Sequence, residues 1–180
     1  MQAALDALDR DVAAGTESCG DLGLAIARDG TWSYRGSPVR REGLVKLFAS
    51  VLHRTTDGRY WLVTPGELGT IDVADVPFVA VEMQIDGDGP SQAIALRTNL
   101  GDWVTVGADH PLRLRAQPDG SSAPYVTVRD ALEARLDRAV YYDLVDVAVA
   151  VDQRFGVWSG GVFFPLETEA DMVATASARP

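Results

Sequence analysis

The sequence predicts an α+β protein in which short hairpins alternate with two helices. Two-residue turn signals such as Asp29-Gly30 separate short apolar runs, because a type I′ turn requires positive φ at both central positions. Apolar residues recur at helical spacing between residues 44 and 52 and again between residues 132 and 148. Hydrophobic residues make up 47% of the 180-residue chain, which is enough for a substantial core.

The first half contains a predicted hairpin, a helix and a further strand. Ser37 can cap the free N–H groups at a helix start, and Pro38 suits the first helical position because its missing N–H costs nothing there. We expect a helix from about Ser37 to His53 with one apolar stripe, made of Leu44, Leu47, Phe48, Val51 and Leu52. The flanking strands are expected at Leu24–Arg28, Trp32–Tyr34 and Tyr60–Val63.

The second half is predicted to contain further strands and a second helix. A strand at Phe78–Ile85 ends in a loop rich in Asp, Gly and Pro, residues 86–90, which is the first candidate for a domain boundary. We accordingly expect an N-terminal α+β domain at residues 1–88 and a C-terminal α+β domain at residues 89–180. Thr127 is a good N-cap, so we expect a kinked helix, or two abutting helices, to begin there.

The two halves share an order of elements: a turn, a strand, a short cap, a helix with arginine in its first turn, and a hairpin. The first copy would span residues 29–62 and the second residues 119–158. Few residues are identical between the two stretches. An internal repeat therefore competes with the simple alternation of elements that is common in small α+β proteins.

The composition disfavours several classes of partner. The chain has 16 basic and 26 acidic residues, a formal net charge of −10, and an acidic surface repels phosphate backbones and anionic lipid. Cys19 is the only cysteine, which excludes an internal disulfide framework and a cysteine-rich zinc site. The N-terminus lacks a basic start, and no apolar run approaches the roughly 20 residues of a membrane span. We expect a cytoplasmic bacterial protein that binds neither nucleic acid nor membrane.

No motif for catalysis, a cofactor or a metal stands out. Ser159-Gly160-Gly161 has the composition of an oxyanion loop, but no histidine is near in sequence and the stretch fits a hairpin turn. The loop at residues 86–90 lacks the twelve-residue spacing of an EF-hand. An enzyme would need a polar cluster that the spacing does not reveal, so we expect no enzymatic activity, no cofactor and no metal site.

Five segments of the chain together resemble the DUF1285 family of uncharacterised bacterial proteins. They are RDGTWSYRGSPVRREGLVKLFASVL, DGRYWLVTPGELGTIDVADVPFVAVEM, LRTNLGD, PYVTVRDALEARLDRAVYYDLV and WSGGVFFPL, and the likeness runs from about Leu24 to Leu166. The resemblance implies two small β-rich rolls, each with a helix packed on a mostly antiparallel sheet, and related helix-and-sheet motifs in the two halves. The family has no established activity, and the resemblance implies a role in ligand binding and signal transduction.

Arginines in the first turns of the two predicted helices are the candidate anchors of a ligand. Arg40, Arg41 and Arg129 would lie at helix N-termini, which already carry partial positive charge. A negatively charged partner is therefore needed to offset the repulsion. Free N–H groups and arginine together could hold a carboxylate or phosphate ligand. Alternatively, internal carboxylates pair with the arginines, and Glu67 and Glu133 are the candidates for this pairing.

Aromatic residues near these helices could form the walls of a pocket, although such residues on alternating strands are more often core. The hypothetical ligand-binding residues are Trp32, Arg40, Tyr60, Thr64, Glu67, Tyr125 and Arg129. The predicted function is a small-ligand-binding module for an anionic or aromatic metabolite. The alternative is a structural or interaction protein without a small-molecule ligand, which could form a homo-oligomer.

Overall fold

The protein is mostly β in the part of the chain that the structure describes. The structure, a computed structural model, describes residues 20–64 and 68–167. These residues form fifteen strands, two α-helices and one short 3-10 helix. The predicted α+β class is therefore only partly correct, because strands dominate over helices.

Two compact units divide the chain. Unit 1 comprises residues 1–77 and 129–132, and unit 2 comprises residues 78–128 and 133–180. The loop at residues 86–90, where the composition predicted a domain boundary, connects two neighbouring strands of one sheet in unit 2.

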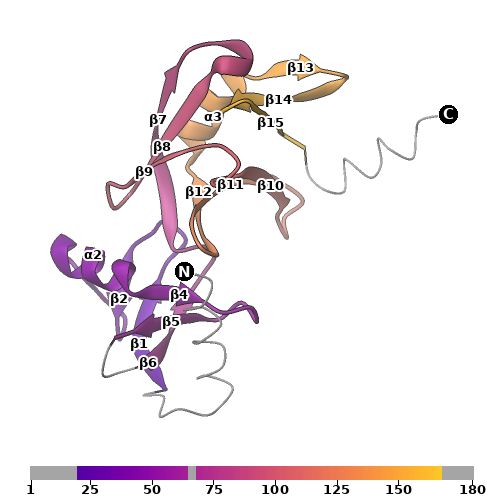
Figure 1. Cartoon of the computed structure of the whole chain (residues 1–180). Coiled ribbons are helices and arrows are strands. Elements are labelled where there is room, and N and C mark those ends of the chain that lie inside the picture. Colours follow the sequence, from indigo (N-terminus) through magenta and orange to yellow (C-terminus); the bar gives the residue numbers. More distant parts are fainter. Residues whose placement is uncertain (1–19, 65–67, 168–180) are drawn as a thin grey trace. The chain divides into compact units, whose positions relative to one another are not determined.

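Unit 1 is built on one six-stranded sheet (Figure 1). Its elements are β1 (Asp21–Ile26), β2 (Trp32–Tyr34), β3 (Ser37–Pro38), α2 (Glu42–Ser50), β4 (Leu52–Arg54), β5 (Tyr60–Val63) and β6 (Leu68–Val73). The strand order is β3-β2-β1-β6-β5-β4. All neighbours are antiparallel except β1 and β6, which pair in parallel with Ala25 opposite Asp72. The sheet thus consists of two three-stranded meanders, joined through the first strand of one and the last strand of the other.

Helix α2 is shorter than predicted because residues at both ends of the predicted helix form strands. Ser37 and Pro38 form β3, which pairs with β2, and they do not start the helix. Arg41 is the N-cap residue, in an extended conformation and without a side-chain capping hydrogen bond. The predicted C-terminal turn of the helix contains β4 instead.

Unit 2 contains a second six-stranded sheet and a three-stranded sheet. Its elements are β7 (Phe78–Asp86), η1 (Gly89–Ser91), β8 (Ala93–Thr98), β9 (Trp103–Thr105), β10 (Leu112–Ala116), β11 (Ser122–Arg129), β12 (Leu132–Leu136), α3 (Arg138–Asp146), β13 (Val149–Val151), β14 (Arg154–Ser159) and β15 (Val162–Pro165). The strand orders are β10-β11-β12-β7-β8-β9 and β13-β14-β15. Buried Ser159 joins the two sheets, because its hydroxyl accepts from the Ile94 N–H at 2.9 Å and donates to the Val106 carbonyl at 2.7 Å.

The two six-stranded sheets have the same topology. In unit 2, as in unit 1, two meanders meet through a parallel pair of the first and the last strand, here β7 and β12. The predicted relation between the halves is confirmed for the sheets. The predicted correspondence between individual strands of the two sheets is wrong. By position in the sheet, β2 corresponds to β8, whereas the sequence comparison matched it with β11. The helices also differ in place, because α2 connects two meanders and α3 follows the second sheet.

The helix predicted to begin after Thr127 is wrong. Residues 122–129 and 132–136 are the strands β11 and β12, and Asp130, with a φ of 48°, lies in the turn between them. The sequence pattern is ambiguous here. Leu132 and Leu136 are four residues apart, and this spacing fits both a helix face and one face of a strand. The true helix α3 begins after Asp137, whose carboxylate accepts from the Val140 N–H at 2.9 Å.

Replacing Gly156 with alanine should destabilise the protein. A Cβ at this position of β14 would overlap the Phe164 carbonyl oxygen and the Phe163 ring, and the backbone cannot move away freely. We expect a loss of about 1–3 kcal/mol in the free energy of unfolding, measured by urea denaturation. Gly43→Ala in α2 is the matched control. Nothing lies within 4 Å of its Cβ position, so this variant should be neutral or stabilised. Equal stabilities of the two variants would contradict the packing described for β14 and β15.

Candidate functional site

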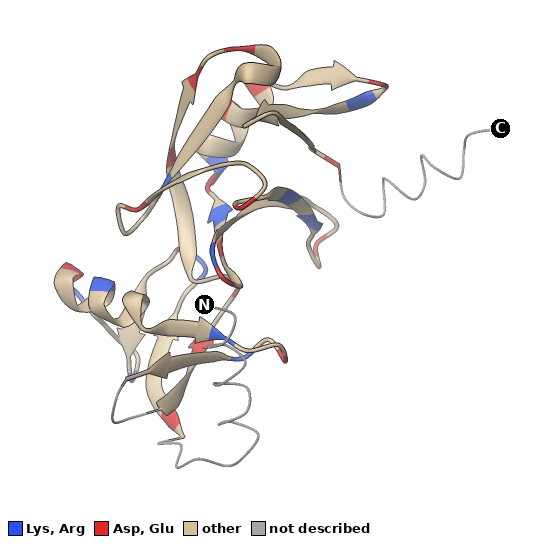
Figure 2. Cartoon of the chain, in the orientation of Figure 1, with Lys and Arg blue, Asp and Glu red and all other residues tan. Residues whose placement is uncertain are grey.

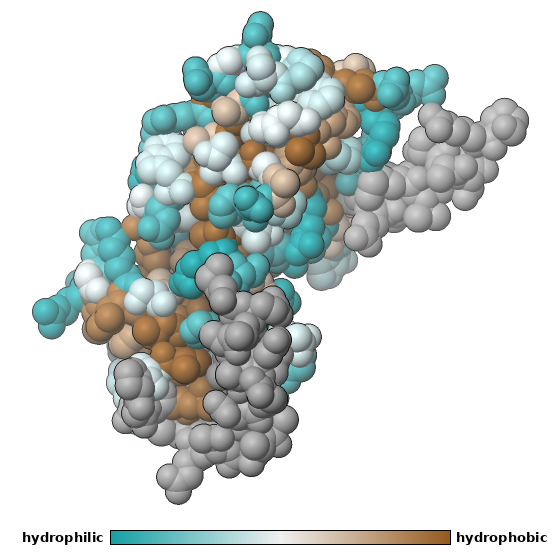
Figure 3. All heavy atoms as spheres, viewed as in Figure 1, coloured by the Kyte–Doolittle hydropathy of each residue, from teal (hydrophilic) through white to brown (hydrophobic). Residues whose placement is uncertain are grey.

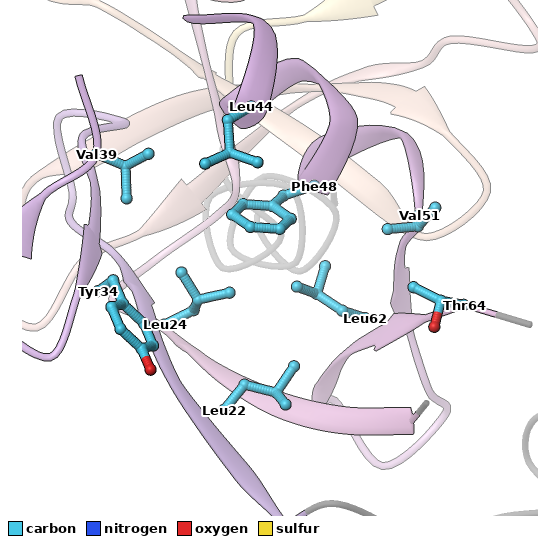
Figure 4. A pocket seen from close by; sticks show the side chains of 9 residues that line it. All are labelled: Leu22, Leu24, Tyr34, Val39, Leu44, Phe48, Val51, Leu62 and Thr64. Carbon is cyan, nitrogen blue, oxygen red and sulfur yellow. The ribbon is translucent and has the colours of Figure 1, made fainter. Parts of the chain in front are cut away.

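An apolar pocket lies between α2 and the sheet of unit 1 (Figure 4). Its volume is about 490 Å³. The residues that line it are Leu22 and Leu24 of β1, Tyr34 of β2, Val39, Leu44 and Phe48 of α2, Val51, Leu62 of β5, and Thr64. Among these described lining residues, only Tyr34 and Thr64 contribute polar side-chain atoms, so this part of the lining is made almost entirely of carbon.

The pocket exists because α2 divides its apolar residues between two sides. Val45 and Ala49 are buried, whereas Leu44 and Phe48 are half-buried and face the pocket (Figure 4). Leu47, which the sequence placed in the same stripe, is 59% exposed and does not line the pocket. Hydrophobic residues accordingly gather on the visible face of unit 1 (Figure 3).

Three predicted aromatic residues are core residues and do not line the pocket. Trp32 is 2% exposed, and its ring stacks on that of Phe48 with centroids 6.0 Å apart, so it supports the pocket wall from behind. Tyr60 is 8% exposed and its ring lies 5.5 Å from the Arg54 guanidinium carbon. Tyr125 is 1% exposed and belongs to unit 2.

The structure does not bring the other predicted site residues together. Of the predicted site residues that the structure describes, Thr64 alone lines the pocket. Arg40 is exposed and lies two residues before α2 begins. Glu67 lies outside the described residues, so its predicted pairing with an arginine stays a prediction.

Arg129 lies near the C-terminal end of α2, and not at a helix start as predicted. Its guanidinium donates a hydrogen bond to the backbone carbonyl of Ala49, in the last turn of the helix. Positive charge is favourable there, because the carbonyls at a helix C-terminus are partly negative. The pKa of half-buried His53 is lowered by burial and, secondly, by the charge of Arg129, while Asp130 acts in the opposite direction.

Glu133 is a shared partner for two arginines of β10. One carboxylate oxygen accepts from Arg113 at 2.5 Å and the other from Arg115 at 3.1 Å, and the Glu133 side chain is only 3% exposed. Arg115 also stacks on Tyr125, with its guanidinium carbon 3.6 Å from the ring centroid. The basic residues of β10 are blue in Figure 2. Glu133 of β12 was expected to pair with first-turn arginines; it pairs instead with arginines of β10, which lies beyond β11 in the same sheet.

The described residues offer neither a metal site nor a membrane-spanning helix. In residues 20–64 and 68–167, no group of three or more His, Cys, Asp or Glu side chains is placed to hold a metal ion. In the same part of the chain, every helix is too short or too polar to cross a bilayer.

Replacing Glu133 with glutamine should lower the free energy of unfolding by about 1–3 kcal/mol. The amide would leave two guanidinium groups beside a neutral buried partner, although their partial exposure to water limits the loss. Glu82→Gln is the matched control. It breaks the more exposed pair with Arg97 and should cost less than about 1 kcal/mol in the same urea titration. If both variants lose equally little free energy of unfolding, the buried Glu133 carboxylate does not stabilise the fold through its two arginines.

Replacing Arg129 with glutamine should raise the pKa of His53 toward its usual value of about 6.5, without reaching it because the burial remains. The lowered pKa of wild type favours the neutral ring in the folded protein. Stability should therefore fall as pH drops below about 6.5, where the unfolded chain takes up the proton first. An NMR titration of the His53 ring measures its pKa, and urea denaturation at several pH values measures the stability, with the exposed Arg59→Gln as control. An identical His53 titration in Arg129→Gln would contradict the proximity of the two side chains.

Two family models match the chain. The N-terminal domain of unknown function DUF1285 matches residues 15–76, and the C-terminal domain of this protein family of unknown function matches residues 77–166. A crystal structure of a DUF1285 family protein from Silicibacter pomeroyi DSS-3 is 43% identical, with a TM-score of 0.80, and the match covers 87% of this chain and 86% of that one. A DUF1285 family protein from Shewanella baltica OS155 is 28% identical, with a TM-score of 0.54, over 69% of this chain and 91% of that one. None of the curated proteins matches the chain. The matches to both domain models and to the Silicibacter protein show that the chain belongs to the DUF1285 family.

Proposed function

We propose that the protein binds a small, largely apolar molecule in the pocket of unit 1. The observation that carries this proposal is the pocket between α2 and the sheet. Its volume of about 490 Å³ falls within the roughly 300–1,000 Å³ typical of small-molecule sites. Seven of its nine lining residues have side chains of carbon alone, so the ligand would gain its affinity from burial of apolar surface.

The size of the pocket sets an expectation for affinity. Each buried methylene contributes about 0.8 kcal/mol, so a ten-carbon chain would gain up to about 8 kcal/mol. Association costs at least about 4 kcal/mol in lost motion and partly offsets this gain. The net gain of at most about 4 kcal/mol corresponds to a dissociation constant of about 1 mM for a simple aliphatic ligand.

The chemistry of the pocket changes the ligand class expected from sequence. Arg129, one of the predicted anion anchors, directs a donor at the Ala49 carbonyl, and Arg40 does not line the pocket. The lining supports an apolar ligand body, to which an aromatic group would also be suited. A role in signal transduction would then consist in a response to occupancy of this pocket.

Binding of 1-decanol tests the proposal. Isothermal titration calorimetry should show saturable binding to wild type, and Leu44→Trp should weaken it at least about fivefold because the larger side chain occupies pocket volume. Leu47→Trp is the matched control, since it adds the same group to the same helix at a residue that does not line the pocket. Its affinity for decanol should equal that of wild type.

Two outcomes would contradict the proposal. One is the absence of saturable decanol binding to folded wild type. The other is an equal response of Leu44→Trp and Leu47→Trp, which would place the binding elsewhere. A stable oligomer in light scattering together with absent decanol binding would instead favour an interaction protein without a small ligand.

A further inference from the structure

An arginine without an acidic partner lies beside the apolar pocket. Arg35 directly follows the pocket residue Tyr34, and its guanidinium carbon is 5.2 Å from the centroid of the Tyr34 ring. Figure 4 shows that ring at the edge of the pocket. Within residues 20–64 and 68–167, no carboxylate lies within ion-pair distance of Arg35. A positive charge with unused donors is thus available next to a carbon-lined space.

The backbone fixes the place of this arginine. The Arg35 N–H donates to the Gly23 carbonyl of β1 at 2.7 Å. The stem of the side chain lies over Gly23, where an added Cβ would come within 3.1 Å of the Arg35 Cγ. The ring of the pocket residue Tyr34 lies 3.8 Å from the same Cβ position, so the Arg35 side chain is held beside the rim of the pocket.

Turn geometry alone does not account for arginine at this position. Arg35 has a φ of 47° and Gly36 a φ of 80°, the left-handed pair of a two-residue hairpin turn between β2 and β3. Such turns favour Asn, Asp or Gly at the first of these positions, and a residue with a bulky side chain is disfavoured there. The protein therefore keeps a guanidinium group at this edge against a local backbone preference.

We propose that Arg35 selects ligands in which the apolar body ends in an anionic head group, such as a medium-chain carboxylate. The alkyl chain of the ligand would occupy the pocket, and its carboxylate would accept hydrogen bonds from the Arg35 guanidinium. This inference rests on the proposed function, because the head group can be selected only if the pocket holds the chain. The chain's net charge of −10 repels anions in general, so a local cation is needed for an acid to be preferred.

The test compares decanoate with 1-decanol on wild type, Arg35→Asn and Arg35→Lys at pH 7.5 and low salt. Asparagine tolerates the positive φ, so the variant should fold at least as stably as wild type. The ratio of the two dissociation constants cancels effects on the pocket that both ligands share. We expect Arg35→Asn to lose about three- to tenfold of the preference for decanoate, and Arg35→Lys to retain part of it. The difference should shrink in 0.5 M NaCl, because salt screens an exposed ion pair.

Each outcome separates this inference from the proposed function. If decanol binds, but the ratio is the same in wild type and Arg35→Asn, the head-group selection by Arg35 is wrong and the apolar site stands. If neither decanol nor decanoate binds to folded wild type, both are wrong. Decylamine has a positively charged head group, which the Arg35 guanidinium repels. Arg35→Asn should therefore bind decylamine more tightly than wild type does.

Discussion

The connection between the two edges of the unit 1 sheet is the constraint on which the rest of this unit depends. Strands β3 and β4 lie at opposite edges of the six-stranded sheet, although only residues 39–51 separate them. Five strand spacings of about 4.8 Å would place the edges of a flat sheet about 24 Å apart. Nine helical residues cover only about 13.5 Å of that distance. Helix α2 is therefore too short to cover the width of the sheet, and an apolar space is left beside it.

Unit 2 meets the same constraint in another way. Strands β9 and β10 also lie at opposite edges, and the six residues that join them are largely bends. A fully extended link would only just span about 24 Å, and the bends shorten it, so the edges of this sheet must curl toward each other. Because this sheet is curled, its connection from β9 to β10 needs no helix. The two sheets can therefore share a strand topology without sharing the position of a helix.

Local chemistry was enough to predict many elements, but not their long-range pairing. Turn signals gave Trp32–Tyr34 and Tyr60–Val63 with the bounds that the structure has. The spacing of Leu132 and Leu136 was ambiguous between helix and strand, and only burial on both sides of β12 decides it. The pocket could not be predicted, since its walls come from separated strands and from the side of α2 that remains half-buried. Among the predicted site residues within 20–64 and 68–167, Thr64 is the one that lines it.

The arginines show why charge arguments depend on the exact position of the backbone. A guanidinium is disfavoured at a helix start, but Arg129 lies at a helix end, where the same dipole attracts it. Glu133 accepts from Arg113 and Arg115 within unit 2, and not from the first-turn arginines that were expected as its partners. Arg35 lacked any signal as a site residue, because its importance depends on the neighbouring pocket and on its turn conformation.

The central claim is that the space between α2 and β1 receives an apolar chain. A crystal soaked with 10-bromo-1-decanol tests it most directly, because the anomalous signal of bromine locates the chain without assumptions. The account predicts one strong bromine peak between Leu24 and Phe48. Bromine peaks confined to the exposed surface around Leu47, with none inside the pocket, would contradict it.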